Sequence, residues 1–209
     1  MIGRIITGPE DLAEGAQWLA AQEPRFAHAL AQTGPLPLRR RPDGYRALLG
    51  AIVSQQVSVA SANAIWARLD AAGMTDPAPL LQASDEDLRA LGLSRQKARY
   101  ARALADADLD FEALRHAPDA VIIETLTALP GIGVWTAEIY AMFALGRADV
   151  FAPNDLALQE AARVLFDLPL RPKERGLRAM AQVWSPWRAV AAQILWAYYK
   201  VVKDREGVR

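Results

Sequence analysis

The sequence predicts an all-α protein, because apolar residues recur every three to four positions along most of its 209 residues. Helix-starting residues support this periodicity: Ser84 precedes "DEDLRAL", Ser94 precedes "RQKARYARAL", and Ser185-Pro186 precedes the last apolar run. Strand signals are weak, and "VFAP" is too short to build a sheet. We expect helices over residues 9–32, 43–54, 57–72, 84–91, 94–106, 118–128, 133–145, 155–166, 172–182 and 186–203.

The loop "TGPLPLRRRPDG" (33–44) is the clearest break in this pattern, since it concentrates proline and glycine. It predicts a chain folded as two helical lobes. No apolar run reaches the length of about 20 residues that a membrane span needs, and the first residues lack the apolar core of a signal peptide.

Composition excludes several kinds of chemistry. The chain has no cysteine, which rules out disulfides, thiolate metal sites, cysteine nucleophiles and cysteine-ligated iron–sulfur clusters. Lysine and arginine together number 24, as do aspartate and glutamate, so net charge gives no indication of nucleic-acid binding. Any such binding must come from a local arrangement of groups.

The stretch "LPGIGVWTAEIY" (129–140) offers such an arrangement between two helical runs. Pro130 ends the first helix, while Gly131 and Gly133 allow positive φ angles and a close approach by another backbone. The next helix begins near Gly133, and its free N–H groups form an anion site that suits a DNA phosphate without lysine or arginine. The alternative is an ordinary tight turn between two packed helices.

A longer stretch around this turn resembles a known family. "TALPGIGVWTAEIYAMFALGRADVFAPNDLAL" (127–158) is similar to the hairpin and downstream aspartate signature of the helix-hairpin-helix (HhH-GPD) DNA glycosylase superfamily. Within it, the nearest branch is DNA-3-methyladenine glycosylase II, which removes alkylated bases. "LLGAIVSQQVSVASANAIWARL" (48–69), "LGLSRQKARYARALA" (91–105) and "SPWRAVAAQILWAYY" (185–199) also resemble segments of that branch, and the similarity covers about residues 20–205.

The resemblance implies a division of the two lobes. Residues 1–41 would pack with residues 150–209 to form one lobe, while residues 42–149 would form the central lobe, with the helix-hairpin-helix at about 118–145. The active site would lie in the cleft between the lobes. We expect no counterpart here to the N-terminal β domain of some family members.

Asp155 matches the family's essential aspartate, after Pro153 and Asn154 at a predicted helix start. Hydrolysis of an N-glycosidic bond develops positive charge on the deoxyribose, as in glycoside hydrolysis, and a fixed carboxylate can stabilise that charge and orient or deprotonate a water. The local alternative is a helix N-cap without a catalytic role. Asp149 is expected to cap or bridge near the same turn.

The tryptophan after the hairpin separates two reaction types. Bifunctional members of the superfamily carry a lysine two residues after the second hairpin glycine, and here that residue is Trp135. An indole cannot form the Schiff base that strand cleavage needs. The resemblance therefore implies a monofunctional hydrolase that leaves an abasic site and lacks lyase activity.

Aromatic residues are the expected base pocket. Trp135 and Trp196 match the family's pocket aromatics, whose faces bind a cationic alkylpurine by stacking and cation–π attraction. Tyr140, one turn beyond Trp135, and Gln55 are expected to line the same pocket. The alternative for each aromatic residue is a place in the apolar core, which we expect for Trp184 and Trp187.

The remaining expected contacts concern the DNA itself. Gln56 matches the residue that enters the duplex when the base is flipped out, and a polar turn is the alternative for "SQQVS". The phosphate-binding hairpin would comprise Leu129, Pro130, Gly131, Ile132, Gly133 and Thr136. By resemblance, the backbone carbonyls of Thr127, Leu129 and Ile132 would hold a monovalent cation, Na⁺ or K⁺.

These expectations describe a DNA glycosylase of base excision repair that releases alkylated purines such as 3-methyladenine from duplex DNA. It would need no cofactor or iron–sulfur cluster, bind damaged double-stranded DNA and no membrane, and act as a monomer in a cytoplasm of bacterial type. 7-Methylguanine, 1-methyladenine, ethenoadenine and hypoxanthine also fit the pattern. The alternatives are a glycosylase for another damaged base and a non-catalytic DNA-binding protein that uses the hairpin alone.

Overall fold

The computed structural model describes residues 3–205, and the only pairing of extended backbone among them is an isolated antiparallel bridge between Ile5 and Arg147. All other regular structure in this range is helical, which confirms the predicted all-α class. The chain forms two compact units: the first holds the segments up to Arg40 and from Ala141, and the second is Arg41–Tyr140. None of the described helices is long and apolar enough to cross a membrane.

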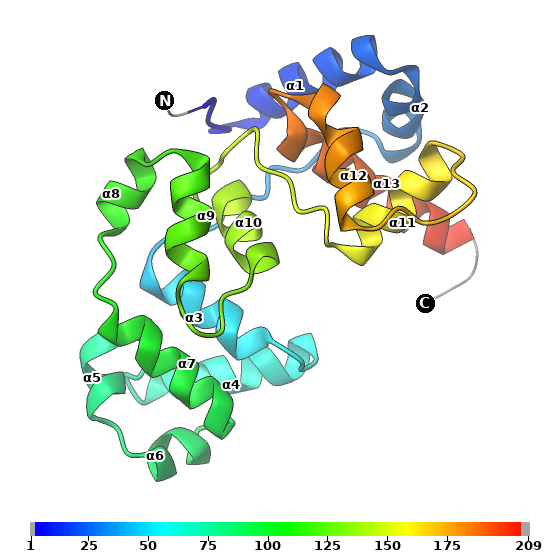
Figure 1. The fold of residues 1–209 in the computed structure, drawn as a ribbon. Helices are drawn as coiled ribbons and strands as arrows, with labels where there is room; N and C mark the ends of the chain where they lie inside the picture. Colours follow the sequence, from blue (N-terminus) through cyan, green and yellow to red (C-terminus); the bar gives the residue numbers. More distant parts are fainter. Residues whose placement is uncertain (1–2, 206–209) are drawn as a thin grey trace. The chain divides into compact units, whose positions relative to one another are not determined.

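The second unit is organised around α7 (Figure 1). Its helices are α3 (Tyr45–Ser54), α4 (Val59–Ala71), α5 (Pro77–Gln82), α6 (Asp85–Ala90), α7 (Arg95–Asp106), α8 (Phe111–His116), α9 (Asp119–Thr127) and α10 (Val134–Phe143), of which α10 continues into the first unit. Helix α7 packs against α3, α5 and α6. Its residues Ala101 and Leu104 are buried. Each fully buried leucine stabilises the fold by roughly 2 kcal/mol.

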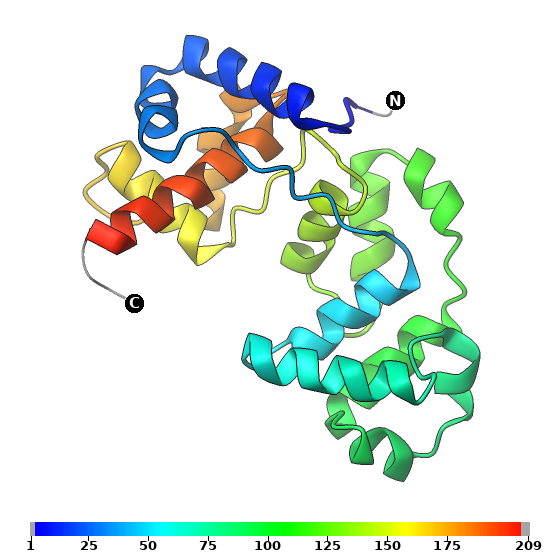
Figure 2. The same cartoon turned by 180° about the vertical axis from the view of Figure 1, so that it is seen from behind.

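The first unit is built around the last helix. Its elements are α1 (Pro9–Gln22), α2 (Pro24–Thr33), α11 (Leu156–Leu165), α12 (Glu174–Met180), the 3₁₀ helix η1 (Ala181–Trp184) and α13 (Arg188–Arg205). Helix α13 packs against α1, α2 and α11, and Figure 2 shows it in red beside α11 in yellow. Trp184 and Trp187 are both buried in this unit, as predicted.

The observed helices differ from the expected ones in three places. The helix expected over 9–32 is two helices, because Glu23 takes an extended conformation (φ −139°, ψ 106°) before Pro24, where the α conformation is sterically disfavoured. The sequence does not predict the six-residue helices α5 and α8, since fewer than two turns give too short a run for the period to emerge. Helix α6 is equally short but is predicted, because Ser84 marks its start.

The boundary expected at 149/150 lies at 140/141 instead. Backbone hydrogen bonds join the segment after Tyr140 to the first unit: Ile6 N–H donates to the Gly146 carbonyl (2.7 Å), and Ala148 N–H donates to the Arg4 carbonyl (3.0 Å). These bonds link residues far apart in sequence, so the local pattern could not reveal them. The first boundary, at 40/41, is one residue from the expected position.

Candidate functional site

The hairpin between α9 and α10 has the backbone geometry of an open helix start. Helix α9 ends at Thr127, Gly131 takes φ 89°, and the Ile132 N–H donates to the Leu129 carbonyl at 3.1 Å. Helix α10 then begins, with the Ala137 N–H donating to the Gly133 carbonyl at 3.0 Å. The first N–H groups of a helix lack an acceptor within the helix itself, and Gly133 and Val134 at this end of α10 are exposed. This end of α10 is accessible to an anion.

The two hairpin glycines have different roles. A Cβ at Gly131 would lie 2.4 Å from the ring of Tyr100 in α7, and the positive φ also disfavours any L side chain. A Cβ at Gly133 would meet no atom within 4 Å. Gly131 therefore allows the hairpin to pack against Tyr100 within the second unit, whereas Gly133 leaves space for an incoming group.

A cavity of about 670 Å³ adjoins the hairpin within the second unit. Its lining joins Gln55 and Gln56 from the turn after α3 to Thr127, Leu129 and Gly133 of the hairpin. The predicted duplex-entering turn and the predicted phosphate-binding hairpin are thus neighbours in the structure. Lys97 and Tyr100 of α7 also line this cavity, and nothing local in the sequence marked them as part of it.

The two glutamines of this turn differ in their contacts and in their backbone conformation. The Gln55 side-chain amide donates to the Gly131 carbonyl at 2.7 Å, so it is engaged with the hairpin backbone. Gln56 is exposed and takes φ 55°, a left-handed conformation that is uncommon for residues other than glycine.

The residues expected to hold a monovalent cation, Thr127, Leu129 and Ile132, line the same cavity. The Leu129 carbonyl already accepts one hydrogen bond, from the Ile132 N–H, and a carbonyl oxygen has a second lone pair. The residues present therefore fit an oxygen-liganded cation, which stays a prediction.

Asp155 lies in the first unit as the N-cap of α11. Its Oδ1 accepts hydrogen bonds from the N–H groups of Ala157 (2.9 Å) and Leu158 (3.1 Å) and from the indole Nε1–H of Trp196 (3.2 Å). The helix N-terminus also favours a negative charge at this position. The capping geometry of one oxygen is thus compatible with a catalytic carboxylate, because these bonds hold the group in one orientation.

The indole that donates to this carboxylate packs against a second aromatic ring, that of Phe143. The two rings have centroids 5.7 Å apart and are tilted by 36°. Trp196 is half-buried, and Phe143 is buried. Phe143 was not singled out from the sequence, because it stands in an apolar helical run where a core position is the default.

Asp149 has the structural role expected of it. Its carboxylate accepts two hydrogen bonds from Arg188, from Nε at 2.8 Å and from Nη2 at 2.9 Å, and one from the Ser185 hydroxyl at 2.7 Å. These bonds tie the segment before α11 to the start of α13.

Trp135 lies in the first turn of α10, in the second unit, and 43% of its surface is exposed. Thr136, beside it, is partly buried. The predicted site residues thus fall into two groups: Asp155 with Trp196 in the first unit, and the hairpin, Trp135 and the two glutamines in the second.

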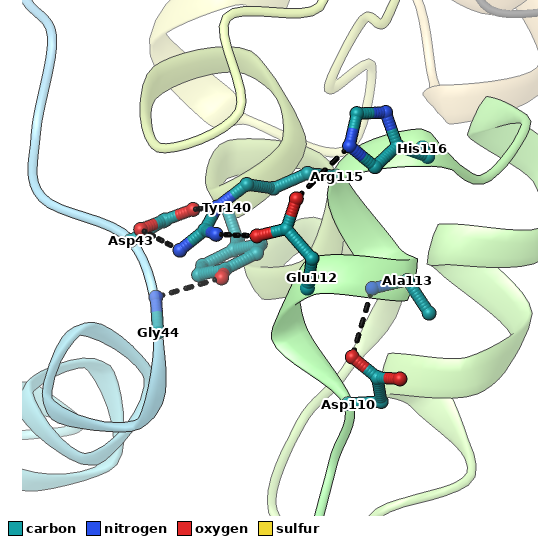
Figure 3. Close-up of polar contacts among 8 residues, drawn as sticks. All are labelled: Asp43, Gly44, Asp110, Glu112, Ala113, Arg115, His116 and Tyr140. Atoms are coloured by element: carbon teal, nitrogen blue, oxygen red, sulfur yellow. Dashed lines mark hydrogen bonds and ion pairs between the residues drawn. The ribbon is translucent and has the colours of Figure 1, made fainter.

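Tyr140 is a core residue that anchors the start of α3. It is 6% exposed, and its hydroxyl accepts a hydrogen bond from the Gly44 N–H at 2.9 Å (Figure 3). Burial raises the pKa of this hydroxyl above its usual value. Nothing in these contacts supports the expected place of Tyr140 in a base pocket.

An ionic network lies beside Tyr140 and holds the chain entering α3. Arg115 of α8 donates to Asp43 from Nε (2.6 Å) and also pairs with Glu112, whose other oxygen contacts His116 (Figure 3). Together with the Tyr140 bond, these pairs fix residues 43 and 44 to α8 and α10 within the second unit.

Helices α9 and α10, joined by a short turn with Gly131 at positive φ, form a helix-hairpin-helix. The family described as "HhH-GPD superfamily base excision DNA repair protein" matches residues 49–188. The chain belongs to this superfamily.

Relatives cover almost the whole chain. A structure of DNA-3-methyladenine glycosidase from Bacillus halodurans is 33% identical, with a TM-score of 0.83 and 91% of each chain covered. The 3-methyladenine DNA glycosylase of Schizosaccharomyces pombe in complex with abasic DNA is 28% identical, with a TM-score of 0.76, covering 88% of this chain and 95% of that chain. An alkylbase DNA glycosidase-like protein from the same yeast is 25% identical over 91% of this chain and 95% of its own length.

Proposed function

We propose that this protein is a monofunctional DNA glycosylase of base excision repair. It hydrolyses the N-glycosidic bond of alkylated, cationic purines such as 3-methyladenine in duplex DNA and leaves an abasic site. The observation that carries the proposal is the carboxylate of Asp155, held at the start of α11 by two backbone N–H groups and the Trp196 indole. The names of the relatives refer to 3-methyladenine or to alkylated bases, and these names support the substrate class.

Asp155 acts on the sugar. As the bond to the base breaks, positive charge develops on the deoxyribose, and a carboxylate beside it stabilises that charge. The same group can orient or deprotonate the attacking water. Because three donors hold Oδ1, little reorganisation is needed when the charge appears.

The base needs less assistance. An N3- or N7-alkylated purine carries a positive charge and is a good leaving group, so strong protonation by the enzyme is unnecessary. An indole face attracts such a base by stacking and cation–π interaction. Trp135, which is partly exposed on α10, and Trp196, beside Asp155, are the residues we assign to this contact.

The identity of Trp135 also argues against lyase activity. A Schiff base requires an amine at the position of attack, and the residue two places after Gly133 is a tryptophan. The reaction therefore ends with hydrolysis, and the abasic strand stays intact.

The second unit holds the DNA. The exposed N–H groups at the start of α10 bind a backbone phosphate, with Na⁺ or K⁺ on the carbonyls of the hairpin, and Gln56 enters the space left by the flipped base. The protein acts as a monomer and needs no organic cofactor.

Chromatography of the bases released from randomly methylated duplex DNA tests this function. We expect release of 3-methyladenine and an equal number of abasic sites without strand breaks. Binding of the duplex without release of any base would indicate a non-catalytic DNA-binding protein. Release from oxidised or mismatched DNA alone would assign a different base specificity.

A further inference from the structure

Gln55 connects two segments of the second unit that lie far apart in sequence. It is the first residue after α3, and its side-chain Nε2 donates to the Gly131 carbonyl of the hairpin at 2.7 Å. The residue is only partly exposed, so solvent competes weakly for this bond. Gln55 therefore ties the turn after α3 to the backbone of the hairpin.

Helix α7 supports both ends of this connection. The Lys97 ammonium donates to the Val53 carbonyl in the last turn of α3 at 2.7 Å, and partial burial lowers the pKa of that lysine. The Tyr100 ring lies against Gly131, and its hydroxyl accepts a hydrogen bond from Gln96 at 2.6 Å. The turn after α3 and the hairpin thus rest on one helix face.

The contacts of Gln55 and of α7 position the next residue, Gln56. Gln56 is exposed and has φ 55°, a conformation that a non-glycine residue keeps only when its surroundings hold it there. The bond of Gln55 fixes the backbone on one side of Gln56, and the N-cap bond from the Ser61 N–H to the Ser58 hydroxyl fixes the other side.

We propose that Gln55 is a positioning residue that couples the hairpin to the duplex-entering turn, so that a phosphate bound at the hairpin sets where Gln56 enters the base stack. This inference rests on the proposed function. It predicts that Gln55 matters for opening the duplex and much less for holding DNA or breaking the glycosidic bond.

The test compares two substrates. One duplex carries the alkylated purine in a normal pair, and the other carries it opposite an abasic analogue, where the lesion is already poorly stacked and unpaired. Single-turnover base release is measured at saturating enzyme for wild type, for Gln55→Met, which keeps the length of the side chain but lacks the donor, and for Gln55→Glu. Gln82→Met, at an exposed position at the end of α5, is the matched control.

We expect both Gln55 variants to release the paired lesion about tenfold more slowly than wild type, and the unpaired lesion within about twofold of wild type. Their affinity for undamaged duplex should stay within about threefold. A 2-aminopurine beside the lesion should report less unstacking with the variants than with Gln82→Met.

Equal losses on both substrates would overturn the inference, because they would indicate a defect of folding or of chemistry, and thermal unfolding would separate those two. An unchanged rate on the paired substrate would also overturn it. Failure of the proposed function is distinguishable, since the wild-type protein would then release no base from either duplex.

Discussion

The indole Nε1–H of Trp196 donates a hydrogen bond of 3.2 Å to Oδ1 of Asp155, across 41 residues of sequence. The same oxygen accepts both capping bonds of α11. A tryptophan assigned to the base by resemblance is thus also a partner of the carboxylate, and these two tasks can be separated by substitution.

Trp196→Phe removes the indole N–H and keeps an aromatic face. A hydrogen bond to a charged group contributes about 1.5–3 kcal/mol, so single-turnover base release should fall about ten- to hundredfold while the affinity for duplex DNA is kept. Trp18→Phe, on α1, is the control and should leave the rate unchanged. If Trp196→Phe releases the base as fast as wild type, the hydrogen bond to Asp155 does not contribute to the reaction, and Trp196 acts only through its aromatic face.

The hairpin glycines should respond differently to alanine. Gly131→Ala forces a side chain into φ 89° and against the Tyr100 ring, so it should lower the free energy of unfolding by about 2–4 kcal/mol. Gly133→Ala meets no neighbouring atom and should cost about 1 kcal/mol or less, yet weaken DNA binding roughly tenfold by crowding the phosphate. Urea denaturation and fluorescence anisotropy measure the two effects. Equal effects of both variants on stability and binding would contradict the assignment.

The wild-type protein should leave the abasic strand uncut. After base release, strand breaks should appear only on treatment with hot alkali, and borohydride should trap no covalent protein–DNA adduct, because Trp135 supplies no amine. Trapping of an adduct would show that a primary amine elsewhere in the protein reaches the sugar, and peptide mapping would identify it.

Alkaline pH should destabilise the fold through Tyr45. Burial raises the pKa of its hydroxyl to about 12, whereas the tyrosine of an unfolded chain has its usual pKa of 10.0. The unfolded state therefore loses its proton first, and the stability present below pH 10 is lost as pH rises from 10 towards 12.

Tyr45→Phe isolates this effect. The Tyr45 hydroxyl is buried and accepts or donates no hydrogen bond among the described residues, so the substitution should be neutral or slightly stabilising at pH 7. Its advantage over wild type in urea denaturation should grow between pH 10 and 12. An advantage that does not change with pH would show that the tyrosine titrates normally.

The apolar pattern predicted most of the helices, and serines mark the starts of α4, α6 and α7. It missed α5 and α8, which have six residues each, and it overlooked that Pro24 interrupts the first long run. The boundary after Tyr140 depends on backbone bonds to Arg4 and Ile6, which no local pattern reports.

The candidate site likewise combines residues that the sequence could identify with contacts that it could not. The family resemblance singled out Asp155 and the hairpin, and the structure places each at a helix start. The bonds of Gln55 to Gly131 and of Trp196 to Asp155 join segments far apart in sequence, and only the packing of the helices brings them together. For the same reason Tyr140 looked like a pocket residue one turn after Trp135, although the packing of α10 buries it and engages its hydroxyl.

Single-turnover base release by Asp155→Asn tests the central claim most directly. Asparagine caps a helix about as well as aspartate, so α11 and DNA binding should be preserved while the negative charge is lost. We predict that release of 3-methyladenine from a saturated duplex falls by at least about 10³-fold, with the affinity for that duplex within about threefold of wild type. Release at close to the wild-type rate by the folded variant would contradict a catalytic role for this carboxylate.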